Sequence, residues 1–137
     1  MKTNTKCTYY GTFGKRMTDA EYLSEIIYVF SEGGRQELRL NEIVKVEGGT
    51  DLSTFFMSDG KRISSKYPLP HFAAKLPAGR FGRYCEKFII NLEYVEDYTT
   101  GSDWAAILVN RKLKVVTKEY IPINRLCRDS FKADFYK

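Results

Sequence analysis

Few residues in this sequence belong to the types that usually carry catalysis or bind metal ions. His71 is the only histidine among 137 residues, which removes most zinc patterns and most pairs of a nucleophile with a histidine. It follows Pro70 and precedes an apolar run, so we expect it to be an exposed residue in the first turn of a helix. The sequence therefore predicts no metal site and no cofactor.

Carboxylates are the other common catalytic groups, and several gather around one predicted turn. They are Glu93, Glu96, Asp97 and Asp103. A pair of carboxylates that hydrolyses a glycosidic bond has to flank its substrate in a cleft, and nothing in the surrounding sequence suggests one. We interpret these residues as a solvated rim and expect that the protein is not an enzyme.

The cysteines indicate a reducing compartment. Cys7, Cys85 and Cys127 are odd in number and widely spaced, which is not the pattern of a disulfide framework. The N-terminus lacks the apolar core of a secretory signal, and no stretch is apolar enough to span a membrane. We therefore expect a cytoplasmic protein with no membrane partner.

Positive charge is concentrated at one end of the chain. The net charge is +5, and residues 1–104 hold equal numbers of basic and acidic residues, 14 of each. Residues 105–137 hold eight basic and three acidic residues, so the whole excess lies there. Concentrated positive charge favours an anionic partner, whereas the same charge spread over a surface mainly aids solubility.

The elements that must position these residues are mainly β-strands. A chain of this length usually forms one domain, and short runs rich in Val, Ile, Tyr, Phe and Thr, separated by Gly, Asp and Asn, are typical of strands and turns. Asp59-Gly60 is the strongest hairpin signal, and Pro122 predicts that the last strand lies at an edge or is irregular. The expected strands cover residues 26–30, 35–40, 43–47, 52–57, 61–64, 84–95, 104–109, 113–117 and 120–123.

Helices are expected to be few and short. Residues 67–76 carry Pro70 near the start and an apolar face at helical spacing, formed by Leu69, Phe72, Ala73 and Leu76. Thr18 with Glu21 is a capping-box pattern, and a short C-terminal helix is also expected. We divide the chain into an N-terminal extension (1–25), a main domain (26–130) and a C-terminal tail (131–137).

Three segments in a fixed order resemble one known family. They read LNEIVKVEGGTDL (40–52) with SDG (58–60), LPHFAAKLP (69–77) with RFGRYCEKFIINLEYV (80–95), and YIPINR (120–125). Together they resemble the LytTR DNA-binding domain, the output module of many bacterial response regulators. The middle segment is the most specific, because it combines a helix, a Phe-x-Arg turn and an apolar strand ending in Asn.

The resemblance implies an elongated fold of small antiparallel sheets whose loops insert side chains into successive major grooves, usually at direct repeats. It implies a transcriptional regulator that binds duplex DNA sequence-specifically. The family's base-contacting positions fall here on Thr50, Asp51 and Leu52, on Cys85, Glu86 and Lys87, and on Arg125.

Two of these three loops depart from the family pattern. Asp51 and Glu86 stand where the family carries polar or basic groups, and Cys85 stands where it commonly has His. Carboxylates can accept a hydrogen bond from cytosine N4 but otherwise repel the phosphates. Either the site reads cytosine, or DNA binding is weak or lost and the domain is a protein-interaction module on the same fold.

The remaining candidates have positioning or phosphate roles. Arg125 and Arg128 lie in the basic C-terminal region and can pair with guanine or phosphate, and Lys87 and Lys114 would contact phosphates. Arg83 either contacts phosphate or braces its turn through backbone carbonyls, and Asn91 is expected to end a strand with hydrogen bonds to nearby backbone.

Two further hypotheses concern regulation. Cys85 is either a small polar side chain or a redox-responsive thiol whose pKa is lowered by Lys87. The 25 residues before the main domain cannot hold a receiver domain, so we expect the input to come from a homodimer, a ligand, a signalling partner or a longer parent protein.

Overall fold

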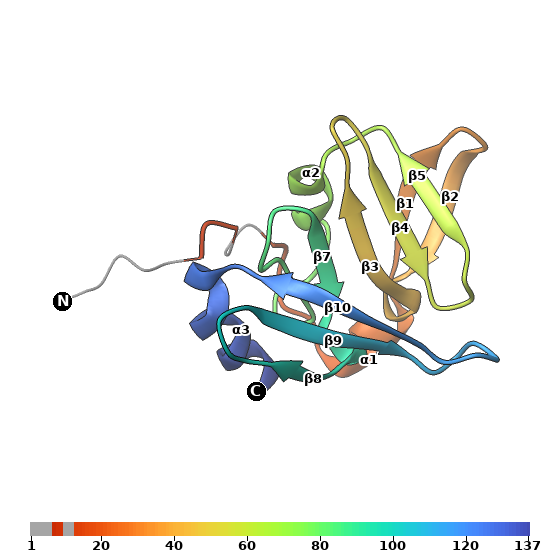
Figure 1. Cartoon of the computed structure of the whole chain (residues 1–137). Coiled ribbons are helices and arrows are strands. Elements are labelled where there is room, and N and C mark those ends of the chain that lie inside the picture. Colours follow the sequence, from red (N-terminus) through yellow and green to blue (C-terminus); the bar gives the residue numbers. More distant parts are fainter. Residues whose placement is uncertain (1–6, 10–12) are drawn as a thin grey trace.

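Three antiparallel sheets form the framework of the computed structural model, which describes residues 7–9 and 13–137. A part of the predicted N-terminal extension, residues 1–6 and 10–12, lies outside the described residues. The sheets confirm the prediction of a mainly β fold (Figure 1). The two-stranded sheet pairs β1 (Ile26–Ser31) with β2 (Gly34–Arg39), and the three-stranded sheet has the order β10-β9-β8, with β8 (Val95–Thr99), β9 (Trp104–Asn110) and β10 (Thr117–Ile123).

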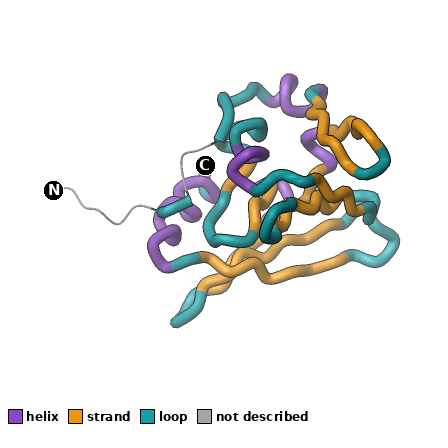
Figure 2. Tube along the Cα trace, turned by 90° about the horizontal axis from the view of Figure 1, so that it is seen from above, coloured by secondary structure: helices purple, strands orange, loops and turns teal. Residues whose placement is uncertain are grey.

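The largest sheet has five strands in the order β5-β4-β3-β7-β6, so β3 lies at its centre. Its strands are β3 (Ile43–Gly48), β4 (Ser53–Met57), β5 (Arg62–Ser65), β6 (Phe81–Gly82) and β7 (Phe88–Asn91). The helices are short and lie around the strands (Figure 2). They are α1 (Asp19–Ser24), α2 (Leu69–Ala73) and α3 (Arg128–Phe135), with 3-10 turns at Leu40–Glu42, Leu92–Tyr94 and Arg125–Cys127.

Local turn and cap signals are confirmed where they were strongest. The hairpin predicted at Asp59-Gly60 forms between β4 and β5, and a second hairpin joins β1 to β2. Gly34 and Gly60 take φ values of +97° and +92° in their turns, a conformation that favours glycine. Thr18 and Glu21 form the predicted capping box at the start of α1. The expected apolar face of the second helix is buried, and the C-terminal helix is present as α3.

The prediction of a single strand over residues 84–95 is wrong. The chain there forms a loop, then β7, then the turn Leu92–Tyr94, and only then β8. Phe88, Ile89 and Ile90 are apolar without alternation because β7 is buried on both faces. Ile89 packs in one core and Ile90 packs in the other. The Asn91 side chain accepts a hydrogen bond from the Glu93 backbone N–H at 3.0 Å, which begins the turn and ends the strand.

The strand expected over residues 113–117 is also wrong. Residues 111–116 form the loop between β9 and β10, and β10 begins only at Thr117. Val115 and Val116 have strand propensity but are 78% and 47% exposed, without a buried face against which to pack. Pro122 lies in β10, at the edge of its sheet as predicted.

Two hydrophobic cores lie on either side of β3 and β7. One gathers β1–β5, α1 and α2 around residues such as Val46 and Phe55, and the other lies under the three-stranded sheet and α3. Tyr22 and Phe131, on the outer sides of the predicted domain boundaries, are both fully buried in these cores. The boundaries at 26 and 130 stay a prediction, and the segments beyond them contribute to the same packing.

The cysteines correct one expectation from the sequence. Cys7 and Cys127 form a disulfide whose Cα atoms are 4.2 Å apart, although 120 positions separate them in the chain. Spacing along the chain did not reveal this pair, because the two residues meet only when the N-terminal segment packs beside the turn that precedes α3. Cys85 is left as a free thiol.

No helix among the described residues is long and apolar enough to cross a membrane.

Candidate nucleic-acid interface

Three loops carry the residues that the sequence predicts to contact DNA. Backbone hydrogen bonds hold these loops next to one another. We call residues 48–52 the first loop, 83–87 the second loop and 124–126 the third loop. The Gly48 N–H donates to the Lys87 carbonyl at 2.7 Å, which joins the first loop to the second. The Asn124 N–H donates to the Tyr84 carbonyl at 2.7 Å, which joins the third loop to the second. The three loops therefore form one continuous surface.

The first loop connects two central strands of the large sheet. Gly49 donates its N–H to the Leu52 carbonyl at 2.7 Å, which closes the turn and leaves Asp51 and Leu52 exposed. A Cβ atom on Gly48 would lie 2.8 Å from Leu69 Cγ, so a side chain there would push against α2. Glycine at this position thus allows the loop to lie close to the helix.

A cavity of about 500 Å³ separates the first loop from the second. Its walls come from the first loop, from the start of α2 and from the second loop. Glu86 and Lys87 reach it from the second loop, and both are exposed. The lining includes Thr50, Pro68, Pro70, Arg83, Glu86 and Lys87.

Arg83 braces the second loop. Its Nη2 donates to the Glu86 carbonyl at 2.5 Å, and its guanidinium lies 4.8 Å from the centre of the Tyr9 ring. Partial burial lowers the pKa of the guanidinium. The side chain is thus engaged with the protein, which is the bracing alternative that the sequence left open.

The surroundings of Cys85 oppose the low thiol pKa that a redox-responsive cysteine needs. The side chain is half-buried, and burial raises the pKa of the thiol, against the smaller lowering effect of hydrogen bonds from the Phe88 and Lys87 backbone. Burial thus opposes a thiolate at this position, and a redox role for Cys85 stays a prediction. A thiol with a raised pKa stays protonated near neutral pH and reacts slowly.

The third loop exposes Arg125. Asn124 caps the 3-10 turn by accepting a hydrogen bond from the Leu126 N–H at 3.0 Å. Arg125 is the first residue of this turn and is exposed. Of the ion pairs among the described residues, none involves Arg125 or Lys87, so both cations are available to a ligand.

Two predicted residues lie apart from this surface. Arg128 is half-buried, donates from Nη2 to the Ser102 carbonyl at 2.8 Å, and places its guanidinium 5.0 Å from the centre of the Trp104 ring. Lys114 lies in the loop between β9 and β10, at the end of the hairpin opposite the third loop (Figure 1).

Asn91 lies behind the surface and is fully buried. Its Nδ2 donates to the Ile43 carbonyl and to the Tyr22 hydroxyl, both at 2.8 Å. The hydroxyl of Tyr22 in turn donates to Glu93 Oε1 at 2.5 Å, so that Asn91 anchors α1 to the junction of β7 and β8. These contacts hold the end of β7, the strand that follows the second loop.

Sequence reasoning missed an exposed pair of rings beside the cavity. Tyr67 and His71 stack with ring centroids 4.3 Å apart and an interplanar angle of 16°. Both are exposed, and they flank the two prolines that line the cavity. The four-residue spacing of these two rings around the helix start was the available signal.

Among residues 7–9 and 13–137, no three His, Cys, Asp or Glu side chains gather closely enough to hold a metal ion.

Comparison with known proteins gives a similar fold. No protein-family model and no curated protein sequence matches the chain. Among solved structures, the fold is similar to the LytTr DNA-binding domain of a Bacillus cereus protein described as a methyl-accepting/DNA response regulator. The TM-score is 0.64 at 17% sequence identity, and the match covers 81% of this chain and 96% of that one.

The chain therefore has a LytTr-type fold, with three small antiparallel sheets and few helices.

Proposed function

We propose that the chain binds duplex DNA sequence-specifically, as a bacterial transcription regulator without catalytic activity. The observation that carries this proposal is the continuous surface of the three loops, in a fold that resembles a LytTr DNA-binding domain. Loops of this size that project side chains from a rigid sheet can enter the major groove, where the base edges distinguish all four base pairs.

Each exposed side chain has a role that its chemistry suits. The planar fork of Arg125 can donate two hydrogen bonds to guanine O6 and N7, or to a phosphate. Lys87 supplies a point charge to the phosphate backbone, which positions the domain without reading bases. Arg83 and Asn91 act through the protein, because their polar atoms hold the second loop and the strand after it.

The two acidic residues restrict which DNA the loops accept. Asp51 and Glu86 are exposed on the first and second loops, where an unpaired carboxylate repels phosphate but can accept from cytosine N4. We therefore propose a target site that contains cytosine. The same two carboxylates favour the second candidate function, a protein-interaction module on this fold with little affinity for DNA.

We propose the cytoplasm as the place of action because the DNA target lies there. The disulfide between Cys7 and Cys127 removes the separate argument from unpaired cysteines. A homodimer or a signalling partner remains our proposal for the source of the regulatory input.

Replacing Arg125 with alanine is expected to weaken binding to the target duplex by about 1–3 kcal/mol, because a bidentate contact with one base or phosphate is lost. Fluorescence anisotropy with a labelled duplex measures the change. Lys114→Ala removes a positive charge at the far end of the β9–β10 hairpin and is the control. Equal losses in the two variants would show that binding depends on overall charge and would contradict a role for the third loop.

A further inference from the structure

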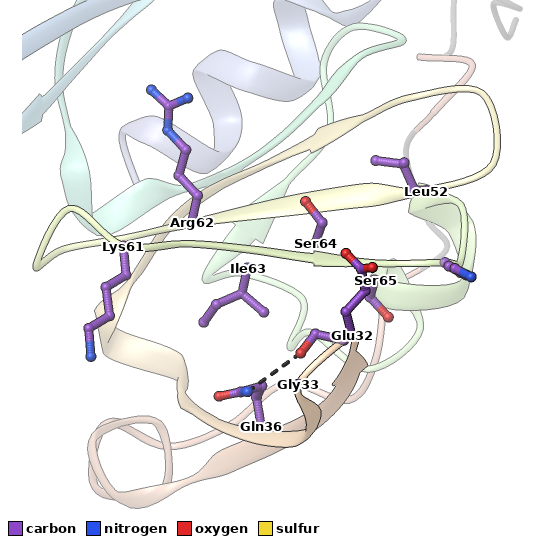
Figure 3. A pocket seen from close by; sticks show the side chains of 11 residues that line it. Glu32, Gly33, Gln36, Leu52, Lys61, Arg62, Ile63, Ser64 and Ser65 are labelled. Carbon is purple, nitrogen blue, oxygen red and sulfur yellow. Dashed lines mark hydrogen bonds between the residues drawn. The ribbon is translucent and has the colours of Figure 1, made fainter.

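A cavity of about 730 Å³ lies between β5 and the β1–β2 hairpin, away from the cavity between the first and second loops (Figure 3). This volume is within the range of sites that bind ligands. Residues from both elements line it, with Leu52 from the first loop at one end. Its walls include Ser31, Gln36, Leu52, Lys61, Ile63 and Lys66.

The cavity borders an open strand edge. β5 is the edge strand of its sheet, and the Met57 N–H donates to the Lys61 carbonyl at 2.9 Å, so the backbone of Lys61 faces β4. Because backbone groups alternate along an antiparallel strand, the N–H and carbonyl groups of Arg62 and Ser64 face outward. No strand among the described residues pairs with that side of β5. Such a row of groups is a template for another strand.

The hairpin forms the opposite wall and is tied to β5 at one end. The Ser65 hydroxyl donates to the Phe30 carbonyl in β1 at 2.5 Å. Ile63 points from β5 toward the hairpin, where Gln36 lies opposite, whereas Arg62 points away from it (Figure 3). The groove thus has an apolar contact at its centre and polar groups on its walls.

Charge determines which strand fits. Lys61 and Lys66 stand at the two ends of β5, and Glu32 is the acidic residue in the lining. The nearest carboxylate to Lys61 is Asp59 at 4.0 Å, and both side chains are exposed. A second copy of this chain is a poor occupant, since antiparallel pairing of two β5 edges would bring Lys61 of each copy close to Lys66 of the other.

We propose that this edge binds an extended segment of a partner protein that carries acidic side chains and adds as a strand to β5. Backbone hydrogen bonds to Arg62 and Ser64 would supply the binding energy, and acidic side chains facing Lys61 and Lys66 would supply the selectivity. This site meets the first loop only at Leu52. The proposal does not rest on the DNA function, and binding is measured without DNA.

The test uses a fluorescein-labelled octapeptide of alternating valine and glutamate, with alternating valine and lysine as the comparison peptide. The full chain is expected to bind the glutamate peptide at least about tenfold more tightly than the lysine peptide. Ser64→Pro removes one outward N–H at a position where an edge strand tolerates proline, and is expected to weaken binding at least about tenfold. Ser64→Ala is the matched control, because both variants lose the hydrogen bond between Ser64 and Thr54, and only the proline loses the N–H.

A second variant keeps the proposal testable if Ser64→Pro does not fold. Replacing both Lys61 and Lys66 with glutamate is expected to reverse the preference in favour of the lysine peptide. Absence of binding to the glutamate peptide by the unmodified chain, equal binding by the proline and alanine variants, or an unchanged preference in the double variant would each overturn the proposal. In that case the two lysines only protect an open edge from aggregation.

Discussion

Raising the salt concentration from about 50 mM to about 200 mM is expected to weaken binding to the target duplex by about 100-fold. Lysine and arginine that neutralise phosphates release condensed cations, and the logarithm of the affinity falls with a slope of about −0.9 per phosphate. Two copies on a direct repeat, each bringing the positive charges of Lys87 and Arg125 to the duplex, would release about four condensed cations and give this change. Anisotropy titrations at several salt concentrations measure the slope.

The size of the slope separates the two candidate functions. Lys87→Ala is expected to make the slope shallower by about one per copy, and Lys114→Ala is expected to leave it unchanged. An affinity that is independent of salt, or the absence of any binding at low salt, would favour the protein-interaction module. It would also indicate that Asp51 and Glu86 prevent the approach of phosphates.

Reducing the disulfide is expected to lower the free energy of unfolding by about 2–4 kcal/mol. Cys7 and Cys127 are 120 positions apart, so the bond greatly restricts the unfolded chain. Both side chains are buried, and the bond attaches the N-terminal segment to the turn before α3. Urea unfolding of the oxidised protein and of the protein reduced with excess dithiol measures the difference.

The free cysteine provides the control for this experiment. Cys85→Ser is expected to change the free energy of unfolding by less than about 1 kcal/mol in the oxidised protein, because no covalent bond is lost. Equal unfolding midpoints for the oxidised and reduced wild-type protein would contradict the stabilising role of the disulfide.

Features that depend on neighbouring residues could be predicted from the sequence. The hairpins follow from glycine and Asp-Gly signals within a few positions, and α2 follows from a proline and an apolar face at helical spacing. The capping box likewise needs only Thr18 and Glu21. In each case the interacting groups are close in the chain, so that local patterns suffice.

Features that depend on distant packing could not be predicted. Residues 84–95 have strand character, but the break after β7 depends on Asn91, which is anchored by α1 and β3. Val115 and Val116 have strand propensity without a partner strand. Predicting the disulfide requires knowing that Cys7 packs beside the turn that precedes α3.

In the candidate site, too, local features could be predicted from the sequence and contacts between distant residues could not. The resemblance placed Asp51, Glu86 and Arg125 on loops, and the structure leaves all three exposed. The sequence predicts Arg128 as a DNA contact because it is basic and near Arg125. In the structure its side chain contacts Trp104 and Ser102, which only the fold brings to it. Charge along the sequence therefore indicated the region and not the individual contacts.

Selection of bound sequences from a random duplex pool is the most direct test of the claim that the three loops read DNA. We predict enrichment of a short motif that contains guanine and cytosine, and that Arg125→Ala loses the preference at one position of this motif while the others remain. Recovery of no enriched sequence, or of the same motif with unchanged preferences by the Arg125→Ala variant, would contradict it.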